Sequence, residues 1–389
     1  MLYSYSFANR KRDLSDVLST VIKDEPRFIS DFKRVPDAQR NKHEWLEDQV
    51  TGRSFAVASV TSGGELTATE ADILKIKGGT LLTFGQSPAL YQVTSVGTST
   101  ASVTLAASNG VATALPVSSG AVAKIISTPM AEGTTAGDGE ERYAQSGTNY
   151  NTTQIFRKEI KITGTALATA VYGNADNQIN RQTAFALSDL ARDLNRVALF
   201  GRRVEGDDSH KGEAGGLYAF ATGSGALSVN ASSAALDSYI LNDAIEAIMG
   251  EGGDPAQILC SPGQARVISN EYKNRLQVLR SDDRRGAYVA AIVNEINGHG
   301  LTIIADPDMP DTEAWVLDPS GFGLSNLKGR AISDEDATPA GFDGILRVAL
   351  GELTFEFKNA KQRCCRIYGL MSSPSAIAAY KTAAAGGSN

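Results

Sequence analysis

The sequence contains few residues of the kinds that build a chemical site. Among its 389 residues are three cysteines and three histidines. An odd number of cysteines, two of them the neighbours Cys364 and Cys365, makes no disulfide framework and indicates folding in a reducing compartment. The histidines His43, His210 and His299 are widely separated, and each stands among polar residues. We interpret them as surface or hydrogen-bonded structural residues, not as catalytic ones.

Motifs that carry catalysis or bind metals and phosphates are also absent. The sequence has no G-x-x-x-x-G-K-[ST] loop, no HExxH, no paired CxxC and no G-x-S-x-G. Asp207 and Asp208 beside His210 resemble a metal site, but an adjacent acidic pair in a polar loop is more often a solvated turn. We therefore predict no catalytic residue, no metal site and no cofactor.

Long apolar runs are lacking as well. The stretch 288–293 is among the longest, far short of the roughly 18 apolar residues that a membrane helix needs. No apolar segment precedes a small-residue cleavage site near the start, so we expect neither a secretion signal nor a membrane partner. With 37 basic and 44 acidic residues the formal charge is −7, which does not favour a dedicated nucleic-acid binder.

The most informative pattern lies between residues 149 and 217. Residues 154–163 alternate between apolar and charged side chains and predict a strand. Apolar residues at helical spacing predict one long helix at 176–200, and the glycine-rich phrase EAGGL follows at 213–217. Nothing in this segment is catalytic. It predicts a long arm joined to a rigid helix, as in a structural building block.

The first 36 residues predict an arm that precedes the folded part of the chain. In it, Arg10, Lys11 and Arg12 stand before an amphipathic stretch that ends at Pro26. This basic triplet would contact nucleic acid or an acidic neighbour, or it is a solvated terminus. Three charges give little affinity alone, so we favour the solvated terminus. Residues 43–49 (HEWLEDQ) predict a short charged strand.

The composition changes between residues 51 and 128, where only four basic and three acidic residues occur. Short β-runs separated by Gly, Ser and Asn predict a small sandwich or barrel. The sequences before and after this segment resemble the two halves of one hairpin, so we interpret the segment as an inserted domain. Residues 132–150 predict a flexible loop.

The rest of the chain predicts an α/β domain followed by long strands. Helices are predicted at 234–249, from Pro262 to about 276 and at 284–296, with strands at 257–260, 301–305 and 313–317. At 345–359 the apolar phase slips by one residue across Gly351, which predicts a β-bulge. Residues 364–370 are expected to pair back on that strand, and the tail after Pro374 is expected to be disordered.

The order of these elements resembles the major capsid proteins of tailed bacteriophages, which have the Hong Kong 97-type fold. The phrases that carry the resemblance are TQIFRK at 153–158, EAGGL at 213–217, GHGLTIIADPDMP at 298–310 and GELTFEFKNAK at 351–361. Each phrase is weakly specific alone, and their order and spacing carry the resemblance. Within this fold the chain is similar to the family with a β-rich insertion.

The resemblance implies an α+β fold with a fixed order of parts. These are an N-terminal arm (1–36), an E-loop (37–165) with strands near 43–49 and 154–163 and the inserted β-domain (51–128), a peripheral domain with the long helix (166–235 and 325–373), an axial α/β domain (236–324) and a tail (374–389). The arm would face packaged DNA through Arg10, Lys11 and Arg12. The E-loop would contact a neighbouring subunit through Gln154, Phe156, Arg157, Lys158, Glu159 and Lys161.

The function that the resemblance implies is assembly of hexamers and pentamers into an icosahedral or prolate shell around a double-stranded DNA genome. Scaffolding, portal and decoration or cement proteins would be its partners, with assembly in the bacterial host cytoplasm and residence in the virion. Two other classes stay open. An encapsulin-like compartment would share the fold but enclose a protein cargo, and a hydrolase would need an active site that the sequence does not display.

Overall fold

The computed structural model describes residues 27–47, 54–60, 65–73, 75–84, 89–97, 100–105, 121–130, 132–133, 147–169, 178–271, 291–293, 296 and 298–378. The chain forms two compact units. The inserted unit is Leu46–Gly147, and the larger unit consists of Met1–Trp45 and Thr148–Asn389. The basic triplet at 10–12 and the tail after 378 lie outside the described residues. The fold mixes helices and strands, as the sequence predicts.

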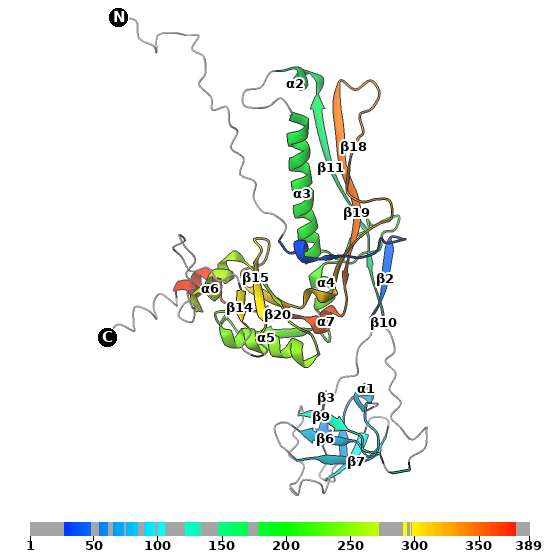
Figure 1. The fold of residues 1–389 in the computed structure, drawn as a ribbon, viewed down its shortest axis with the longest axis vertical. Helices are drawn as coiled ribbons and strands as arrows, with labels where there is room; N and C mark the ends of the chain where they lie inside the picture. Colours follow the sequence, from blue (N-terminus) through cyan, green and yellow to red (C-terminus); the bar gives the residue numbers. More distant parts are fainter. Residues whose placement is uncertain are drawn as a thin grey trace, which may run out of the picture. The chain divides into compact units, whose positions relative to one another are not determined.

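An elongated arm of the larger unit consists of one long helix lying along a β-sheet (Figure 1). The helix is α3 (Gln178–Phe200), and the longest strands are β11 (Gln154–Thr163) and β19 (Gly344–Phe357). The predicted strand and the predicted long helix are both confirmed. The strand order is β1–β17–β19–β11, and β18 also pairs with β19. The short strands are β1 (Lys33–Arg34), β17 (Phe322–Asn326) and β18 (Ser333–Asp336).

The alternation in β11 decides which face of the sheet the helix covers. Phe156 and Ile160 are buried, and Lys158 between them forms a 2.5 Å ion pair with Asp193 of α3. The even-numbered side chains therefore face the helix. The odd-numbered ones, from 155 to 163, are all exposed on the opposite face. At β11 the helix α3 thus covers one face of the sheet, and the other face is exposed to solvent.

The larger unit contains two hydrophobic cores. The first lies under the C-terminal half of α3 and includes Leu190, Leu194 and Phe357. The second surrounds a sheet of order β12–β20–β16–β13–β15–β14. Its elements are β12 (Leu227–Asn230), α5 (Ser238–Gly250), β13 (Gln257–Cys260), α6 (Pro262–Glu271), β14 (Ala291–Val293), β15 (Gly300–Ala305), β16 (Glu313–Leu317) and β20 (Cys364–Tyr368).

The two adjacent cysteines of β20 join these cores. Cys364 packs in the first core and Cys365 in the second, because successive side chains of a strand point to opposite faces. Burial raises the pKa of the Cys365 thiol to about 12. Both thiols are therefore inert packing groups.

Short helices complete the larger unit. They are η2 (Ile29–Asp31), α2 (Gly164–Ala168), α4 (Leu217–Ala221), η5 (Pro319–Gly321) and α7 (Ala360–Arg363). At the predicted start of α6, Ser261 Oγ accepts a 3.1 Å hydrogen bond from the backbone N–H of Gln264 and so caps the helix. No helix in the described part of the chain has both the length and the apolarity needed to cross a membrane.

Three local predictions are wrong in the larger unit. Residues 364–368 do not pair back on the long strand; they join the second sheet between β16 and β12. Residues 291–293 form a strand, not part of a helix. The register between β11 and β19 runs through Gly351 without a bulge. Residues 351–357 are buried on both faces of the strand. The apolar residues can therefore change from even to odd positions there without a bulge.

The inserted unit is a seven-stranded sheet of order β3–β9–β6–β7–β8–β5–β4. Val57 and Ala58 connect the two edge strands, β3 and β4, and close the sheet into a barrel. The N–H of Val57 donates to the carbonyl of Ala121 at one edge, and the N–H of Ala58 donates to the carbonyl of Thr67 at the other. The segment 51–128, for which we predict a small sandwich or barrel, lies within this unit. Its elements are β3 (Ser54–Ala56), β4 (Ser59–Val60), β5 (Glu65–Thr67), α1 (Glu70–Ile73), β6 (Leu81–Phe84), β7 (Tyr91–Val96), β8 (Thr100–Leu105) and β9 (Val122–Ser127).

The hairpin that carries the inserted unit has a different second strand from the one we predicted. β2 (Lys42–Glu47) pairs with β10 (Gly147–Thr152), in a region that the sequence predicted to be a loop. The strand at 154–163 is instead paired over its whole length with β19. The prediction that 154–163 returns along 43–49 is therefore wrong. Ten residues of apolar and charged alternation match the long, half-buried β19, not a six-residue strand.

Candidate functional site

The junction between β10 and β11 is where the chain leaves the hairpin and enters the arm. Thr153 separates the two strands, and its N–H donates a 2.7 Å hydrogen bond to the carbonyl of Asn41. Its hydroxyl donates to Glu352 Oε1 at 2.6 Å, and Arg330 forms a 2.9 Å ion pair with the other carboxylate oxygen of Glu352. The junction is thus fixed to the residue that precedes β2 and to β19.

Asn151 is the buried centre of this junction. Its amide nitrogen donates to the carbonyls of Gly215 (3.0 Å) and Phe355 (2.8 Å). Its amide oxygen accepts from the N–H groups of Gly215 (2.7 Å) and Thr152 (2.9 Å). One fully buried side chain therefore joins the hairpin, the loop after α3 and the long strand β19. The amide of Asn151 thus supplies a hydrogen-bond partner to four backbone groups, two carbonyls and two N–H groups.

In the phrase EAGGL (213–217), Gly216 is required because the backbone there lies very close to the backbone at the end of α3. The N–H of Gly216 donates to the carbonyl of Gly201, just past the end of α3, at 2.9 Å. A Cβ atom on Gly216 would lie 2.7 Å from the carbonyl oxygen of Ala198 and 2.8 Å from the nitrogen of Gly201. Only glycine fits between the end of α3 and the start of α4.

His43 and Glu356 fasten the hairpin to the long strand. His43 Nε2 lies 2.6 Å from Glu356 Oε1, and Lys358 lies 2.8 Å from Oε2. Burial by itself raises the pKa of Glu356, but the hydrogen bonds from His43 and Lys358 outweigh it, and the net pKa is lowered below the ordinary value of 4.5. The structural, hydrogen-bonded role that we predicted for His43 is confirmed.

Glu356 gives a testable dependence of stability on pH. A carboxylate whose pKa is lower in the folded state stabilises the fold above its unfolded pKa, and this contribution is lost as the pH falls through the folded value. We expect Glu356→Gln to lower the free energy of unfolding by about 1 kcal/mol at pH 7. The loss should shrink as the pH is lowered from 5 to 3. Urea unfolding across this range measures it, with the exposed Glu246→Gln as the control; a loss that does not change with pH would contradict the assignment.

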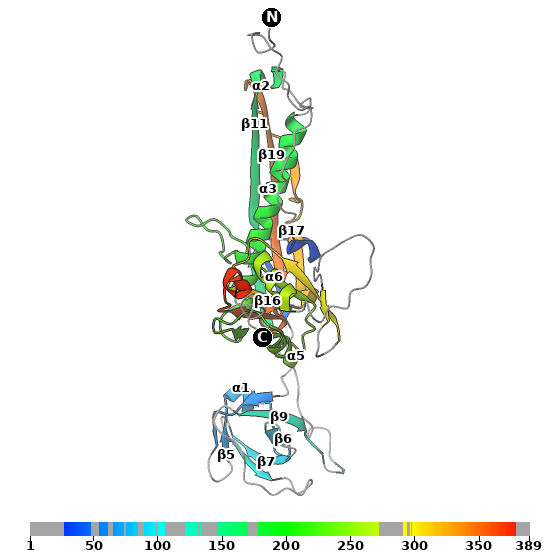
Figure 2. The ribbon, with the colours of Figure 1, turned by 90° about the vertical axis from the view of Figure 1, so that its left-hand side faces the viewer.

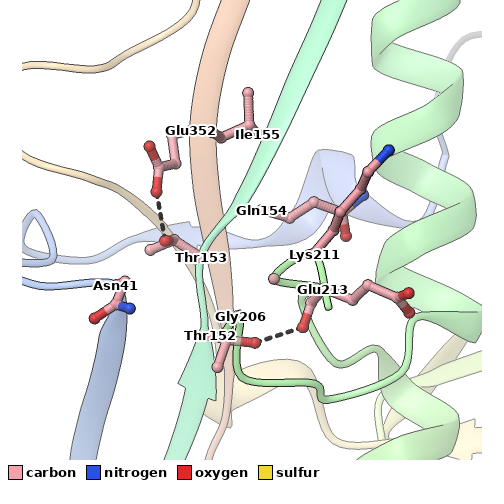
Figure 3. A pocket seen from close by; sticks show the side chains of 10 residues that line it. Asn41, Thr152, Thr153, Gln154, Ile155, Gly206, Lys211, Glu213 and Glu352 are labelled. Carbon is pink, nitrogen blue, oxygen red and sulfur yellow. Dashed lines mark hydrogen bonds between the residues drawn. The ribbon is translucent and has the colours of Figure 1, made fainter. Parts of the chain in front are cut away.

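A pocket of about 610 Å³ opens beside the junction (Figure 3). One wall comes from the junction and the other from the loop between α3 and α4. Its polar groups include the carboxylates of Glu213 and Glu352 and the ammonium of Lys211. The side chain of Ile155, which is 55% exposed, adds an apolar surface.

The structure divides the predicted E-loop contact residues between the two faces of β11. Three of them face their own subunit: Phe156 is 5% exposed within the first core, Lys158 pairs with Asp193, and Gln154 accepts a 3.1 Å bond from the N–H of Ala214. Phe156 is thus not available to a neighbour. The exposed residues of the set are Arg157 and Glu159, which form a 2.7 Å ion pair, and Lys161, whose ammonium lies 4.8 Å from the ring centroid of Phe342.

The base of the N-terminal arm is anchored by a residue that the sequence did not reveal. Asn195 of α3 accepts hydrogen bonds from the N–H groups of Phe28 (3.2 Å) and Ile29 (3.4 Å). Its amide nitrogen donates to Asp306 at 2.7 Å. Phe28, 1% exposed, packs edge-on against Phe322. An asparagine within an amphipathic helix carries no signal of such distant partners; only the nearby aromatic pair Phe28 and Phe32 hints at an anchored segment.

The remaining candidate residues form no chemical centre. His210 contacts Asp207 at 3.0 Å in an exposed turn, which is the solvated turn that we predicted. His299 lies 3.2 Å from Asp254, also on the surface. Within the described ranges, no three or more His, Cys, Asp or Glu side chains gather in a way that could hold a metal ion.

Comparison with known proteins identifies the architecture. The model of the SU10 major capsid protein family matches residues 2–371. The capsid protein of cyanophage A-1(L) has a TM-score of 0.58 at 12% identity, covering 95% of this chain and 100% of the other. The capsid protein of an empty GTA particle has a TM-score of 0.54 at 11% identity, with the same coverage. Curated proteins include no significant match.

The two solved capsids share the fold at low identity, and the family model spans nearly the whole sequence. The predicted Hong Kong 97-type capsid fold is therefore confirmed. The chain belongs to the SU10 major capsid protein family.

Proposed function

We propose that this major capsid protein closes into hexamers and pentamers and that these build the shell around the double-stranded DNA genome of a tailed phage. The observation that carries the proposal is the family match over residues 2–371. A capsid protein acts as one of many copies in a multi-subunit shell. Contacts between unlike surfaces of identical subunits generate rings when the rotation closes, and repeated rings enclose a volume.

The β2–β10 hairpin and its inserted unit are proposed to be the E-loop. A two-stranded sheet is marginal by itself, and each of its strands has an edge available for pairing. Leu46 in β2 is 69% exposed. A neighbouring subunit that covers this hairpin would bury Leu46 and extend the sheet. The arm with α3, β11 and β19 would then serve as the peripheral domain, and the unit around α5 and β13 as the axial domain.

The proposed role as a capsid protein implies further partners, and the basic residues 10–12 indicate one of them, the packaged DNA. Residues 10–12 would make weak, salt-dependent contact with the phosphates of packaged DNA. Separate scaffolding, portal and decoration proteins would act in the host cytoplasm, where assembly takes place. The family role is structural, which argues against the hydrolase alternative. The same match favours a viral shell over an encapsulin-like compartment.

The inserted unit is proposed to decorate the shell, not to assemble it. It is a compact unit with its own closed barrel core, so its removal leaves the larger unit intact. Replacing residues 48–146 by a short glycine-serine turn should still give closed particles in electron micrographs. The full chain is the control. Folded subunits that form no particles would contradict the decorating role and make the inserted unit part of the assembly contact.

A further inference from the structure

The sheet of the arm carries opposite charges at its two edges. The strand order β1–β17–β19–β11 places β1 at one edge and β11 at the other. The loop 202–213, which we name the edge loop, packs against the β11 side: Ala214 donates to Gln154, and the hydroxyl of Thr152 donates to the carbonyl of Glu213. In Figure 2 this loop, in green, projects from one side of the unit, and the dark blue segment that leads into β1 lies on the other.

The edge loop has a fixed conformation. Arg202 and Glu213 form a bidentate ion pair at its base, with distances of 3.0 and 2.8 Å. Val204 and Glu213 exchange two backbone hydrogen bonds of 3.1 and 3.0 Å. At the tip, Asp207 accepts from the N–H groups of Ser209 (2.7 Å) and His210 (2.6 Å). Because the loop is already ordered, a partner would lose little conformational entropy on binding it.

The edge loop has exposed acidic side chains at and beside its tip. The segment 205–211 contains three carboxylates and one lysine, a net charge of −2. Asp207 is used in the turn. Glu205 and Asp208 are exposed, and within the described ranges neither forms a hydrogen bond or a close ion pair, although the charge of Glu205 contributes to the raised pKa of Lys42 in the same subunit. The pocket beside Ile155 continues this surface toward the junction. It can take the apolar stem of a long basic side chain, whose head would reach the carboxylates.

The opposite edge presents the complementary charge. Lys33 and Arg34 of β1 are both exposed, and among the described residues neither of them forms an ion pair. Arg40 and Lys328 do not belong to this edge. Arg40 precedes Asn41, which lines the pocket, and Leu327 beside Lys328 donates its N–H to the carbonyl of the pocket residue Glu352 at 2.9 Å. We name Lys33 and Arg34 the basic edge.

We propose that the edge loop and its pocket bind the basic edge of a second copy of this chain, head to tail. The inference rests on the proposed shell of rings and names the surfaces that close them. Opposite charges at opposite edges of one sheet make the contact heterologous, which is the type that continues from copy to copy into a ring. Complementary charges of this kind steer association and reject wrong orientations.

Charge reversal in the full-length chain tests the contact. The pair Glu205→Lys and Asp208→Lys should reduce the yield of sedimenting particles about tenfold, and so should Lys33→Glu with Arg34→Glu. All four positions are exposed, so circular dichroism and thermal unfolding should match the unmodified protein. Combining the four changes restores opposite charges in the reverse sense. The combined variant should therefore recover particles.

A second acidic pair supplies the matched control for that recovery. Asp243 and Glu246 on α5 are also exposed, and Asp243→Lys with Glu246→Lys makes the same change in net charge. Added to Lys33→Glu and Arg34→Glu, it should not restore particles. Restoration by this control, or failure of the combined variant to recover, would overturn the contact. If the unmodified chain forms particles and the Glu205 and Asp208 reversal forms them equally well, the contact is refuted while the shell stands; an unmodified chain that forms none refutes both.

Discussion

Replacing Gly216 with alanine is expected to lower the free energy of unfolding of the larger unit by about 3 kcal/mol. The new methyl group would meet three backbone atoms at the end of α3, among them the carbonyl oxygen of Ala198 at 2.7 Å. Backbone atoms cannot turn aside as a flexible side chain can, so α4 would have to separate from α3. The hydrogen bond from Gly216 to Gly201 would be lost with that movement.

Chemical unfolding of the two variants side by side measures this effect. Gly250→Ala at the end of α5 is the matched control, because a Cβ there meets nothing within 4 Å. Its stability should stay within about 0.5 kcal/mol of the unmodified protein. Equal stabilities for Gly216→Ala and Gly250→Ala would mean that the close approach of the two backbones is not a constraint.

Replacing Asn151 with leucine is expected to cost about 4 kcal/mol, because it leaves buried backbone groups without partners. The two side chains have the same branching and the same number of non-hydrogen atoms, and all four hydrogen bonds disappear with the amide. Thermal and urea unfolding measure the loss. Asn180→Leu on the exposed side of α3 is the control and should be nearly neutral. A loss below about 1 kcal/mol for the Asn151 variant would show that water replaces the amide.

Local pattern predicted the elements of this fold well. The strands Gln257–Cys260 and Glu313–Leu317 coincide with the predictions. Short apolar runs bounded by turn residues predict strands from a few neighbouring residues alone. The helix α3 follows from the spacing of its apolar side chains. The separate inserted unit follows from the change in composition at residue 51.

Pairing between distant strands could not be predicted in the same way. β11 pairs with a strand that begins at Gly344, and no property of either segment specifies the other. The true partner of β2 is Gly147–Thr152 (GTNYNT), a polar segment without alternation. Its inner end is held by the hydrogen bonds of Asn151, not by an apolar face. Alternation of apolar and polar residues reveals which side chains are buried. β10 is held by hydrogen bonds to particular partners, which such a pattern does not reveal.

The same reason explains which parts of the candidate site were missed. The phrase EAGGL is visible in the sequence, but the need for its glycines follows only from the backbone of α3 beside them. Asn195 and Glu356 resemble ordinary polar residues until their partners Phe28 and His43 are in place. The contact residues that the resemblance implied on β11 included Phe156, which is buried in the first core of its own subunit; alternation identifies a buried face but not the subunit that buries it.

Electron cryomicroscopy of the purified full-length protein is the most direct test of assembly into a shell. We expect closed shells built of five- and six-membered rings, with the β2–β10 hairpin of one subunit lying over its neighbour. In each subunit β11 should remain paired with β19, as it is here. Subunits that stay monomeric under all assembly conditions would rule out the proposed shell, and shells in which residues 154–163 pair with residues 43–49 would rule out the hairpin of β2 and β10.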